Sequence, residues 1–490
     1  MATITKDTLR RFRRVTVMGL GLFGGGAGVA RFFASTGADV LVTDTAPEEK
    51  LRSSVESLRG LGIRFVLGRH DETDFTLTDL VVANQAVRPE NPFLAAARRA
   101  GVPIVTETGL ALALNPSPWA GVTGSSGKST TASLLAAMLR RHDPETLFGG
   151  NIGGDLLTRV DRRSASAPLV AELSSFQLAW IGGDLAAGRI AAPKAAIVTN
   201  LAPNHLDWHR DMDDYVGAKY ALLACQKPDD WAILNVEDAR LAEWAERVPG
   251  RTLACGLADP ERDDACFVHA DDGGGNGAII VRTDGVERVR QPLDRFPLMG
   301  RHNLLNAVQA VAAAFVLCGD RGAIDAGLAA FPGLPHRLET IGIVAGRLFV
   351  NDSKSTTPEA AATALAAMDA PCVLIAGGYD KRAPFDDLGA AIQERAAGLV
   401  LIGEAGPRIG DAVDRASGRR PAALGPLPVR NVGDDFLLAV REALSLAPEG
   451  GVVLLSPACA SYGMFVNYEQ RGERFRAIVA NSLSEGEREC

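Results

Sequence analysis

A chain of 490 residues is too long for one hydrophobic core, and its length predicts about three domains. Its 47% hydrophobic and 22% charged residues are typical of a folded globular protein. The formal net charge of −8 argues against nucleic acid or an anionic membrane as a partner, because both repel an acidic surface. The seven cysteines form no C-x-x-C pair, which favours a reducing cytoplasm over a disulfide framework or a zinc site.

The first apolar segment, LRRFRRVTVMGLGLFGGGAGVA, has two interpretations. Paired arginines before an apolar run are typical of an export signal, whereas VTVMG followed by glycines is typical of a strand and a turn. The second is favoured because the chain continues at once into a helix, Gly37 and another strand, without a clear cleavage site. The longest apolar stretch elsewhere, from residue 307, is too short to cross a bilayer. We therefore expect a cytoplasmic protein without membrane insertion.

The turn after the first strand has the pattern of a nucleotide-binding module. Gly19, Gly21 and Gly24 form G-x-G-x-x-G, and Asp44 ends the next strand, where a ribose-binding acid is expected. The later strands DLVVAN and VPIVTE alternate with helical segments, which predicts a parallel sheet. A NAD-dependent oxidoreductase shows the same pattern, but that alternative gives no role to the phosphate loop that follows.

A phosphate loop begins the second module. The prolines of LNPSPW mark a linker near residue 115, and GVTGSSGKST follows from Gly121 to Thr130. The loop stands between an apolar strand and a helical run, so that backbone N–H groups, a lysine and a hydroxyl face the phosphates and Mg²⁺. The residues expected to contact ATP here are Gly124, Ser125, Ser126, Gly127, Lys128, Ser129 and Thr130.

Polar side chains follow the next strands of this module, PLVAEL and KAAIVTNL. In open parallel sheets, ligands bind at the carboxyl ends of strands, where Glu172 and His205 would join Ser129. Their oxygen and nitrogen atoms suit Mg²⁺ or Mn²⁺ better than zinc, although each alone has an ordinary structural explanation. From periodicity alone, Lys219 is a solvated lysine beside an apolar stripe of its helix. The acidic, glycine-rich segment 259–278 is expected to be an exposed turn.

A second proline-marked boundary, FPGLPHR, precedes a third alternating module. Its strands are RLFVND, CVLIAGG, GLVLIGE and GVVLLSP, and Thr357 with Pro358 opens a helix as N-cap and first residue. The fold class predicted is α/β, with three consecutive domains and mainly parallel sheets. The expected ranges are 1–114 (Rossmann-like), 115–335 (central, phosphate loop) and 336–490 (Rossmann-like).

Eight segments of the chain resemble one enzyme family in their order. These are GVTGSSGKST, GGNIGG, ELSSFQL, NLAPNHLDWH, GRHNLLNA, PHRLE, NDSKST and LLSPACASYGMFVNYEQRG. They resemble the Mur ligases over almost the whole chain, and most of all the members that add glutamate. The resemblance implies that ATP phosphorylates the alanyl carboxylate of UDP-N-acetylmuramoyl-L-alanine and that D-glutamate then attacks the acyl phosphate, in peptidoglycan precursor synthesis. An L-glutamate-adding relative or another Mur step stays an open alternative.

The resemblance also implies that the protein is a monomer, and it implies roles for individual residues. Catalytic roles fall on Lys128, Glu172, His205 and Lys219. Ser129 and Glu172 match ligands of one Mg²⁺, His205 matches a ligand of a second, and Lys219 matches a lysine that carries a carbamate. Asn303, Arg337 and Asp352 match ATP contacts, and the third domain is expected to close on ATP. The substrate contacts implied are Leu22, Phe23, Asp44, Thr45 and Asn151 for the UDP-sugar-peptide, and Lys354, Thr356, Lys381, Ser461 and Tyr468 on the side of the incoming glutamate.

Three positions depart from the family pattern. Ser126 stands where asparagine is usual, Phe23 replaces a smaller residue, and NQAVRP at 84–89 differs from the usual segment. The first change keeps a small polar residue, so ATP binding is expected to survive it. The other two concern the recognition of uracil and diphosphate.

Overall fold

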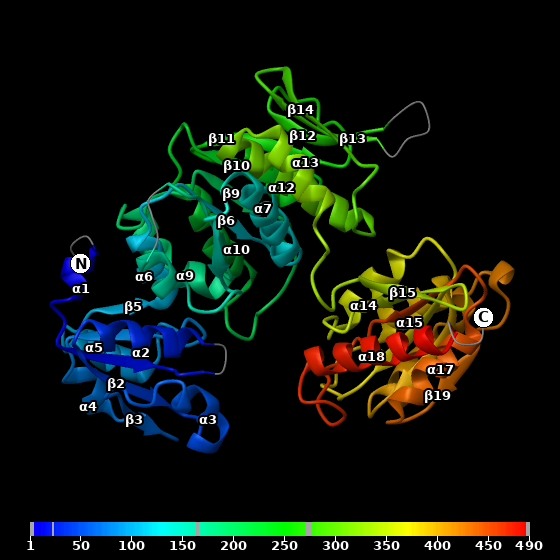
Figure 1. Cartoon of the computed structure of the whole chain (residues 1–490), viewed down its shortest axis with the longest axis horizontal. Coiled ribbons are helices and arrows are strands. Elements are labelled where there is room, and N and C mark those ends of the chain that lie inside the picture. Colours follow the sequence, from blue (N-terminus) through cyan, green and yellow to red (C-terminus); the bar gives the residue numbers. More distant parts are fainter. Residues whose placement is uncertain (1–3, 22–23, 163–165, 271–276, 487–490) are drawn as a thin grey trace. The chain divides into compact units, whose positions relative to one another are not determined.

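The computed structural model of the chain describes residues 4–21, 24–162, 166–270 and 277–486 (Figure 1). The chain forms two compact units, of which the first comprises Met1–Phe296 and Leu305–Phe331 and the second Pro297–Leu304 and Pro332–Cys490. Two sheets lie in the first unit and a third lies in the second. The predicted class of three consecutive α/β modules is therefore confirmed, while the boundaries at 114 and 335 stay predictions.

The first sheet is parallel throughout and has the order β3-β2-β1-β4-β5. Its strands are β1 (Arg14–Met18), β2 (Asp39–Asp44), β3 (Arg64–Leu67), β4 (Leu80–Ala83) and β5 (Ile104–Thr106). Its helices are α1 (Lys6–Leu9), α2 (Gly25–Ser35), α3 (Glu48–Glu56), α4 (Glu72–Thr76), α5 (Pro92–Arg99) and α6 (Glu107–Leu114). This strand order is that of the doubly wound nucleotide-binding fold, as the glycine pattern predicts.

The glycine turn between β1 and α2 needs its glycines. Gly19, Gly21 and Gly24 have φ values of 91°, 62° and 87°, a region that disfavours any Cβ. At Gly26 an added Cβ would lie 2.4 Å from the carbonyl oxygen of Gly19, so α2 starts in close contact with the turn. Leu22 and Phe23, both predicted uridine contacts, lie outside the described residues.

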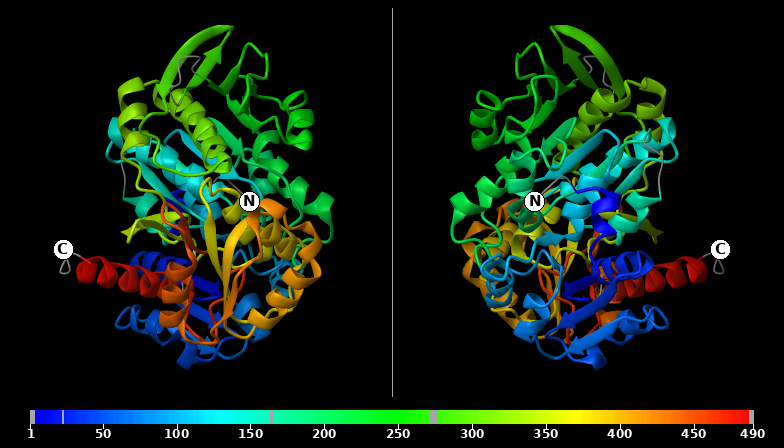
Figure 2. Two further views of the ribbon diagram at one scale, coloured as in Figure 1. Left: turned by 90° about the vertical axis from the view of Figure 1, so that its right-hand side faces the viewer. Right: turned by 90° about the vertical axis from the view of Figure 1, so that its left-hand side faces the viewer.

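The second sheet has the order β14-β13-β12-β11-β10-β9-β6-β8-β7. Its strands are β6 (Trp119–Thr123), β7 (Leu147–Gly150), β8 (Leu169–Glu172), β9 (Ala195–Val198), β10 (Trp231–Asn235), β11 (Arg251–Gly256), β12 (Ala265–His269), β13 (Ala278–Thr283) and β14 (Val286–Pro292). The helices are α7 (Lys128–His142), α8 (Leu156–Asp161), α9 (Ser175–Ala186), α10 (Met212–Ala224), α11 (Ala239–Ala245), α12 (Arg301–Cys318) and α13 (Arg321–Ala329). Pairing is parallel from β7 to β12, and the antiparallel strands β13 and β14 form the edge (Figure 2).

The segment 259–278 is more than the exposed turn that its composition predicts. Strand β12 lies inside it, and Ala265, Cys266 and Phe267 are buried against the neighbouring strands. The prediction was wrong because five apolar or half-apolar residues, ACFVH, were outweighed by the acidic and glycine runs on either side. Composition averaged over a long window hides a strand of this length.

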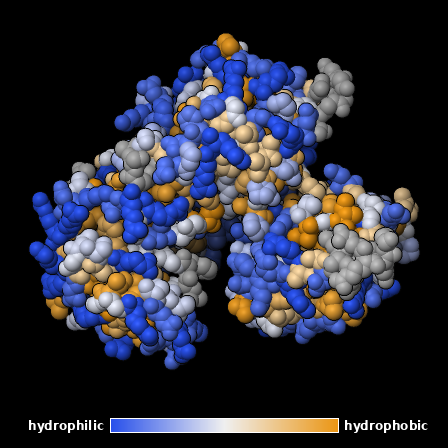
Figure 3. All heavy atoms as spheres, in the orientation of Figure 1, coloured by the Kyte–Doolittle hydropathy of each residue, from blue (hydrophilic) through white to orange (hydrophobic). Residues whose placement is uncertain are grey.

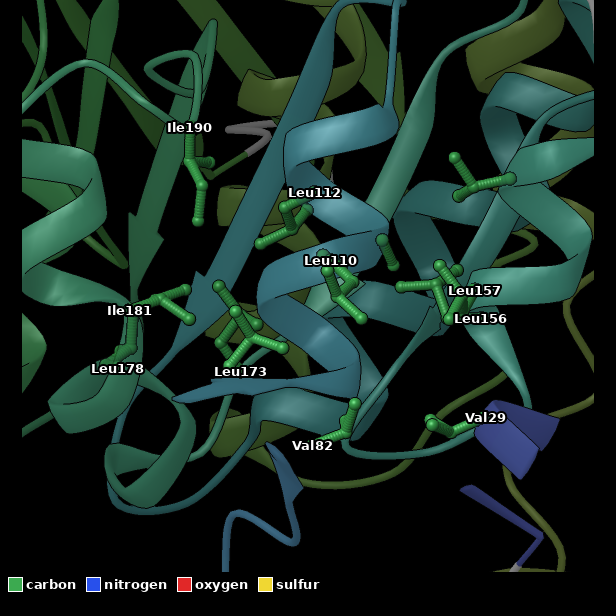
Figure 4. Close-up of a cluster of buried hydrophobic side chains, with 14 of the residues drawn as sticks. Val29, Val82, Leu110, Leu112, Leu156, Leu157, Leu173, Leu178, Ile181 and Ile190 are labelled. Carbon is green, nitrogen blue, oxygen red and sulfur yellow. The ribbon is translucent and has the colours of Figure 1, made fainter. Parts of the chain in front are cut away.

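The first two sheets share one hydrophobic core, which is centred on α6 (Figure 4). Leu110 and Leu112 of α6 lie among Leu156 and Leu157 of α8 and Ile181 of α9, all of them buried. Apolar contact of this extent explains why both sheets belong to one compact unit.

Two tryptophans of the second sheet's connections also bind the first sheet. The indole nitrogen of Trp180 donates to the carbonyl of Val87 at 3.0 Å, and that of Trp208 donates to the carbonyl of Ala86 at 2.9 Å. The segment 84–89 is thereby held by side chains from α9 and from the loop after β9.

The third sheet is doubly wound. Its strands are β15 (Glu339–Val344), β16 (Arg347–Asn351), β17 (Cys372–Gly377), β18 (Ala396–Ile402), β19 (Val429–Asn431) and β20 (Val452–Leu455), in the order β15-β16-β20-β17-β18-β19. Its helices are α14 (Pro358–Ala366), α15 (Asp386–Arg395), α16 (Gly406–Arg415), α17 (Phe436–Leu446) and α18 (Tyr468–Gly486), with short 3₁₀ turns at Ser417–Arg419 and Ala422–Leu424. Alternate strand residues pack into separate cores, one with α14–α16 and the other with α17 and α18.

Polar residues cover most of the face shown in Figure 3, with hydrophobic residues scattered between them. Within the ranges that the structure describes, no helix combines the length and apolar character needed to cross a bilayer.

Candidate active site

The phosphate loop runs from the end of β6 to the start of α7 and depends on two glycines. Gly124 has φ 144°, and a Cβ there would lie 1.9 Å from Oγ1 of Thr199. Gly127 caps α7 with φ 80°, and a Cβ there would lie 2.4 Å from Oδ1 of Asn306. The backbone can approach its neighbours this closely only with glycine. The loop leads into a helix whose first N–H groups have no partner within the helix, which is the geometry of an anion site.

The loop after β9 holds the phosphate loop in place. The backbone N–H of Ser125 donates to the carbonyl of Asn200 at 2.9 Å, and that of Ser126 donates to Oδ1 of Asn200 at the same distance. The hydroxyl of Ser125 lies 2.8 Å from the hydroxyl of Tyr215. The loop after β9 also carries His205. Hydrogen bonds therefore connect the segment of this predicted metal ligand to the predicted phosphate-binding residues.

Two lysines meet at the carbonyl of Gly124. Lys128 Nζ donates to this oxygen and to that of Ser125, each at 3.0 Å, and Lys219 Nζ donates to it at 2.8 Å. Lys219 is only 1% exposed, so periodicity alone was wrong to make it a solvated lysine. Burial, aided by the charge of Lys128, lowers the pKa of Lys219 to about 6. Burial thus favours the neutral form of its amine.

Glu172 ends β8 as an incompletely bonded carboxylate. It is 1% exposed, and its Oε1 accepts from the side-chain amide of Asn151 at 3.1 Å. Its Oε2 is buried and accepts no hydrogen bond from the described residues. Oγ1 of Thr130, in the first turn of α7, is likewise buried without a partner there. Both atoms are open to a hydrogen bond or a coordination bond with a bound group or a water molecule.

His205 lies in the loop after β9 with φ 55°. Its ring packs edge-on against Phe176 at 4.8 Å, and Trp208 packs on the same phenyl ring at 4.6 Å. Partial desolvation and the charge of Lys128 lower the pKa of His205. A neutral imidazole is the form that binds a metal ion.

In the first sheet, the carboxylate of Asp44 binds the glycine turn itself. Its Oδ2 accepts from the N–H groups of Leu20 at 2.9 Å and Gly21 at 3.3 Å, and its Oδ1 accepts from that of Ala46 at 2.8 Å. The carboxylate thus stabilises the turn, and its contact with a ribose stays a prediction. Thr45, next to it, is exposed.

A narrow cavity of about 40 Å³ opens beside this turn. Gly19, Gly26, Asn84 and Glu107 are among the residues that line it. The cavity brings the glycine turn together with the segment 84–89, which departs from the family pattern.

In the second unit, Asp352 follows β16 and is 2% exposed. It accepts from the N–H of Leu338 at 3.2 Å and from the hydroxyl of Ser456 at 2.7 Å, and burial raises its pKa to about 6. Asn303, another predicted ATP residue, donates its amide to the carbonyl of Met299 at 2.8 Å. Arg337 is half-buried.

The predicted glutamate residues lie on the loops after β16, β17 and β20, except for Tyr468, which is the first residue of α18. Nζ of Lys354 is 5.8 Å from the ring centre of Tyr468, so these two are close together. The loops that carry Lys381 and Ser461 are joined where the N–H of Tyr379 donates to the carbonyl of Ala460 at 2.9 Å. Ser461 is buried, Thr356 is half-buried and Lys381 is exposed.

Relatives with assigned names match the chain over nearly its full length. A protein of Roseiflexus sp. (strain RS-1), named UDP-N-acetylmuramoylalanine--D-glutamate ligase, is 42% identical over 95% of this chain and 98% of its own. A protein of the same name from Symbiobacterium thermophilum is 38% identical over 95% and 97%. The chain belongs to the Mur ligase family. Models of the Mur ligase MurD-like N-terminal domain, the middle domain and the glutamate ligase domain match residues 13–106, 122–314 and 336–459.

Solved structures of other Mur ligases share the fold. MurC, the UDP-N-acetylmuramate-alanine ligase of Thermotoga maritima, aligns with a TM-score of 0.59 at 21% identity, over 96% of this chain and 100% of its own. MurF ligase of the same organism, solved in complex with ADP, aligns with a TM-score of 0.56 at 18% identity, over 98% and 99%. At these identities the likeness concerns the fold.

The donor set in this Mur ligase fits Mg²⁺ better than a transition metal. No group of three or more His, Cys, Asp or Glu side chains suited to a metal lies in the part of the chain that the structure describes. Carboxylate and hydroxyl oxygens are the hard ligands that Mg²⁺ prefers. The free Oε2 of Glu172 fits this requirement.

Several residues of the Mur ligase site were not predicted as such. Asn200 and Tyr215 hold the phosphate loop, and no motif marks such support from a neighbouring loop. Arg471 is 1% exposed and binds Ser353 and the carbonyl of Cys459. A signal for Arg471 was present, since it is the arginine of the specific EQRG segment.

Proposed function

We propose that this Mur ligase joins D-glutamate to the alanyl carboxylate of UDP-N-acetylmuramoyl-L-alanine in peptidoglycan precursor synthesis, with ATP converted to ADP and phosphate. The observation that carries the proposal is the 42% identity to a ligase of that name over 98% of its length. The glycine-dependent loop next to Lys128 supplies the nucleotide site that an ATP-dependent ligase needs.

The chemistry follows from the poor reactivity of a carboxylate. The alanyl carboxylate attacks the γ-phosphorus of ATP and forms an acyl phosphate, with ADP as leaving group. The neutral amine of D-glutamate attacks the acyl carbon, and the tetrahedral intermediate expels phosphate and a proton to leave an amide. Lys128 and the first N–H groups of α7 would stabilise the charge on the transferred phosphoryl group.

Ser129, Glu172 and His205 are the residues that would hold Mg²⁺, with two ions proposed and Mn²⁺ as a possible substitute. Bound there, the cations would neutralise phosphate oxygens during the transfer. Lys219 would contribute as a carbamate, because its neutral amine can add to CO₂ with release of one proton. This reaction replaces a buried neutral amine by a negative group with two oxygens.

The substrates are assigned to separate sites. In the first sheet, the glycine turn with Asp44 and Thr45 would bind the UDP moiety, and Asn151 would contact the sugar-peptide. In the second unit, Lys354, Thr356, Lys381, Ser461 and Tyr468 would bind glutamate, while Asn303, Arg337 and Asp352 would contact ATP. We further propose a cytoplasmic monomer, and sedimentation equilibrium measures the oligomeric state.

ADP release tests the function. With ATP, Mg²⁺ and UDP-N-acetylmuramoyl-L-alanine, we expect D-glutamate to start turnover and L-glutamate to leave it near the background. Turnover with L-glutamate alone would contradict the proposed specificity. Stabilisation by NAD, without any effect of the UDP substrate on the melting temperature, would instead favour an oxidoreductase.

A further inference from the structure

Glu107 is a buried acid to which the proposed mechanism gives no role. It is the first residue of α6 and is 8% exposed, within the core shared by the first two sheets. Burying a carboxylate costs free energy unless hydrogen bonds compensate it.

One oxygen of Glu107 binds the start of a neighbouring helix. Oε1 accepts from the backbone N–H groups of Leu156 at 2.9 Å and Leu157 at 3.0 Å, the first two residues of α8. Oε2 accepts from the hydroxyl of Thr108 at 3.3 Å, and that hydroxyl accepts in turn from the side chain of Gln177 at 2.8 Å. The carboxylate therefore ties α6 to both α8 and α9.

The same side chain lines the cavity beside the glycine turn. Gly19 and Gly26 from the turn and Asn84 and Gln85 after β4 form other parts of its wall. Glu107 thus contacts the surroundings of the nucleotide turn on one side and α8 on the other.

The segment that α8 completes carries Asn151. Segment 150–155 runs from Gly150, the last residue of β7, to Asp155, just before α8, and the Asn151 amide donates to the Oε1 of Glu172 at 3.1 Å. At the other end, Asp155 caps α8 through the N–H of Thr158 at 3.0 Å. Asp155 also packs against α2, since a Cβ added to Gly28 would lie 2.3 Å from its Cγ. The segment is fixed between Glu172 and the helix that follows the nucleotide turn.

We propose that Glu107 is a positioning residue that sets segment 150–155 relative to the nucleotide turn, so that the peptide end of a UDP-linked substrate reaches Glu172. The proposal rests on the proposed function for the identity of the substrate. A carboxylate suits this task because it accepts two N–H groups with one oxygen, and charge-assisted hydrogen bonds are stronger than neutral ones. Burial raises the pKa of Glu107 to about 7, so the kinetic comparison is made at about pH 8.5, where the carboxylate is ionised. An amide of the same shape keeps the volume but loses the charge.

The kinetic test compares Glu107→Gln with Asp161→Asn, a control on α8 that removes only a surface ion pair with Lys6. For Glu107→Gln we expect the KM for UDP-N-acetylmuramoyl-L-alanine to rise about tenfold, from the loss of charge-assisted bonds. The KM values for ATP and glutamate should stay within about twofold, since the proposed function assigns neither substrate to segment 150–155. Equal rises in all three KM values, or a lower melting temperature with unchanged KM values, would make Glu107 a structural anchor only.

A second variant covers the case in which Glu107→Gln fails to fold. Glu107→Asp keeps the charge but withdraws both oxygens by one carbon, so a positioning role predicts the same selective rise in KM. An unchanged KM for the UDP substrate in this variant would overturn the proposal.

A substrate-free measurement separates this inference from the proposed function. In Glu107→Gln, amide hydrogen exchange across 150–157 should accelerate relative to the wild type and to Asp161→Asn, whatever the enzyme's substrate. Unchanged exchange there would contradict the inference alone. A wild-type enzyme without turnover of the UDP substrate would contradict the proposed function alone.

Discussion

Two buried charged residues near the phosphate loop differ in their hydrogen bonding from two in the second unit. In the first unit, the Oε2 of Glu172 lacks a partner among the described residues, and Lys219 is buried close to a second lysine. In the second unit, Asp352 accepts from Leu338 and Ser456, and Arg471 donates to Ser353 and Cys459. A buried polar group without a partner costs about 1–3 kcal/mol. Glu172 therefore keeps an oxygen for a ligand, whereas Asp352 and Arg471 order the loops around them. The buried Nε of Arg337, in the second unit, also lacks a partner among the described residues.

The strongest test of this contrast removes the phosphate-loop lysine. Lys128→Met should lower kcat by about 10³-fold, because one donor to a developing charge is worth that much in a dehydrated site. Lys227→Met, at an exposed lysine of the same unit, is the matched control and should keep its activity. The measurement is ADP release at saturating substrates, and a loss below about tenfold would show that the loop does not act in phosphoryl transfer.

The next test concerns the buried lysine beside it. Lys219→Ala should lower kcat by about 10²-fold, and acetate or formate should restore part of it by supplying the missing oxygens. Lys219→Arg should stay inactive because it keeps a positive charge that cannot be converted. Near-full activity of either variant without added carboxylate would contradict the carbamate.

The first unit also shows what a sequence can and cannot predict. The phosphate loop and the N-cap Thr357 were predictable because each depends on backbone geometry that few residues allow. The burial of Lys219 was missed by periodicity, since its helix packs on both sides against α9 and the sheet. Support between loops distant in sequence, such as Asn200 to Ser126, leaves no local pattern. The resemblance to Mur ligases identified the chemistry of these residues, which residue spacing did not.

In the second unit, the corresponding test asks whether Arg471 orients the loops after β16 and β20, which carry predicted glutamate residues. Arg471→Lys should raise the KM for glutamate about tenfold while the KM for ATP changes less, because an ammonium cannot replace a guanidinium that binds two loops at once. Arg474→Lys on the exposed side of α18 is the control. An equal effect on both KM values would mean that Arg471 supports the unit as a whole.

The last test concerns stability against pH. The pKa of Lys219 is about 6 in the folded chain against an ordinary 10.5, so the unfolded chain binds the extra proton between these values. The free energy of unfolding should therefore rise with pH from about 6 to about 10 because of Lys219. Lys219→Met should raise the melting temperature at pH 7 and lose this advantage by pH 10. A gain that does not depend on pH would show that the lysine is charged when folded.

The two indoles that bind the segment 84–89 provide a fluorescence signal from the contact between the first two sheets. Trp180 and Trp208 donate to the consecutive carbonyls of Val87 and Ala86, beside the cavity wall formed by Asn84 and Gln85. Indole emission shifts with the polarity and hydrogen bonding around the ring. The chain has five tryptophans, so replacing the other three by phenylalanine would leave emission from this junction alone. Tryptophan emission could then report the binding of a ligand at the glycine turn of the first sheet in real time. This signal would need no added label and would be separate from the chemistry at the phosphate loop.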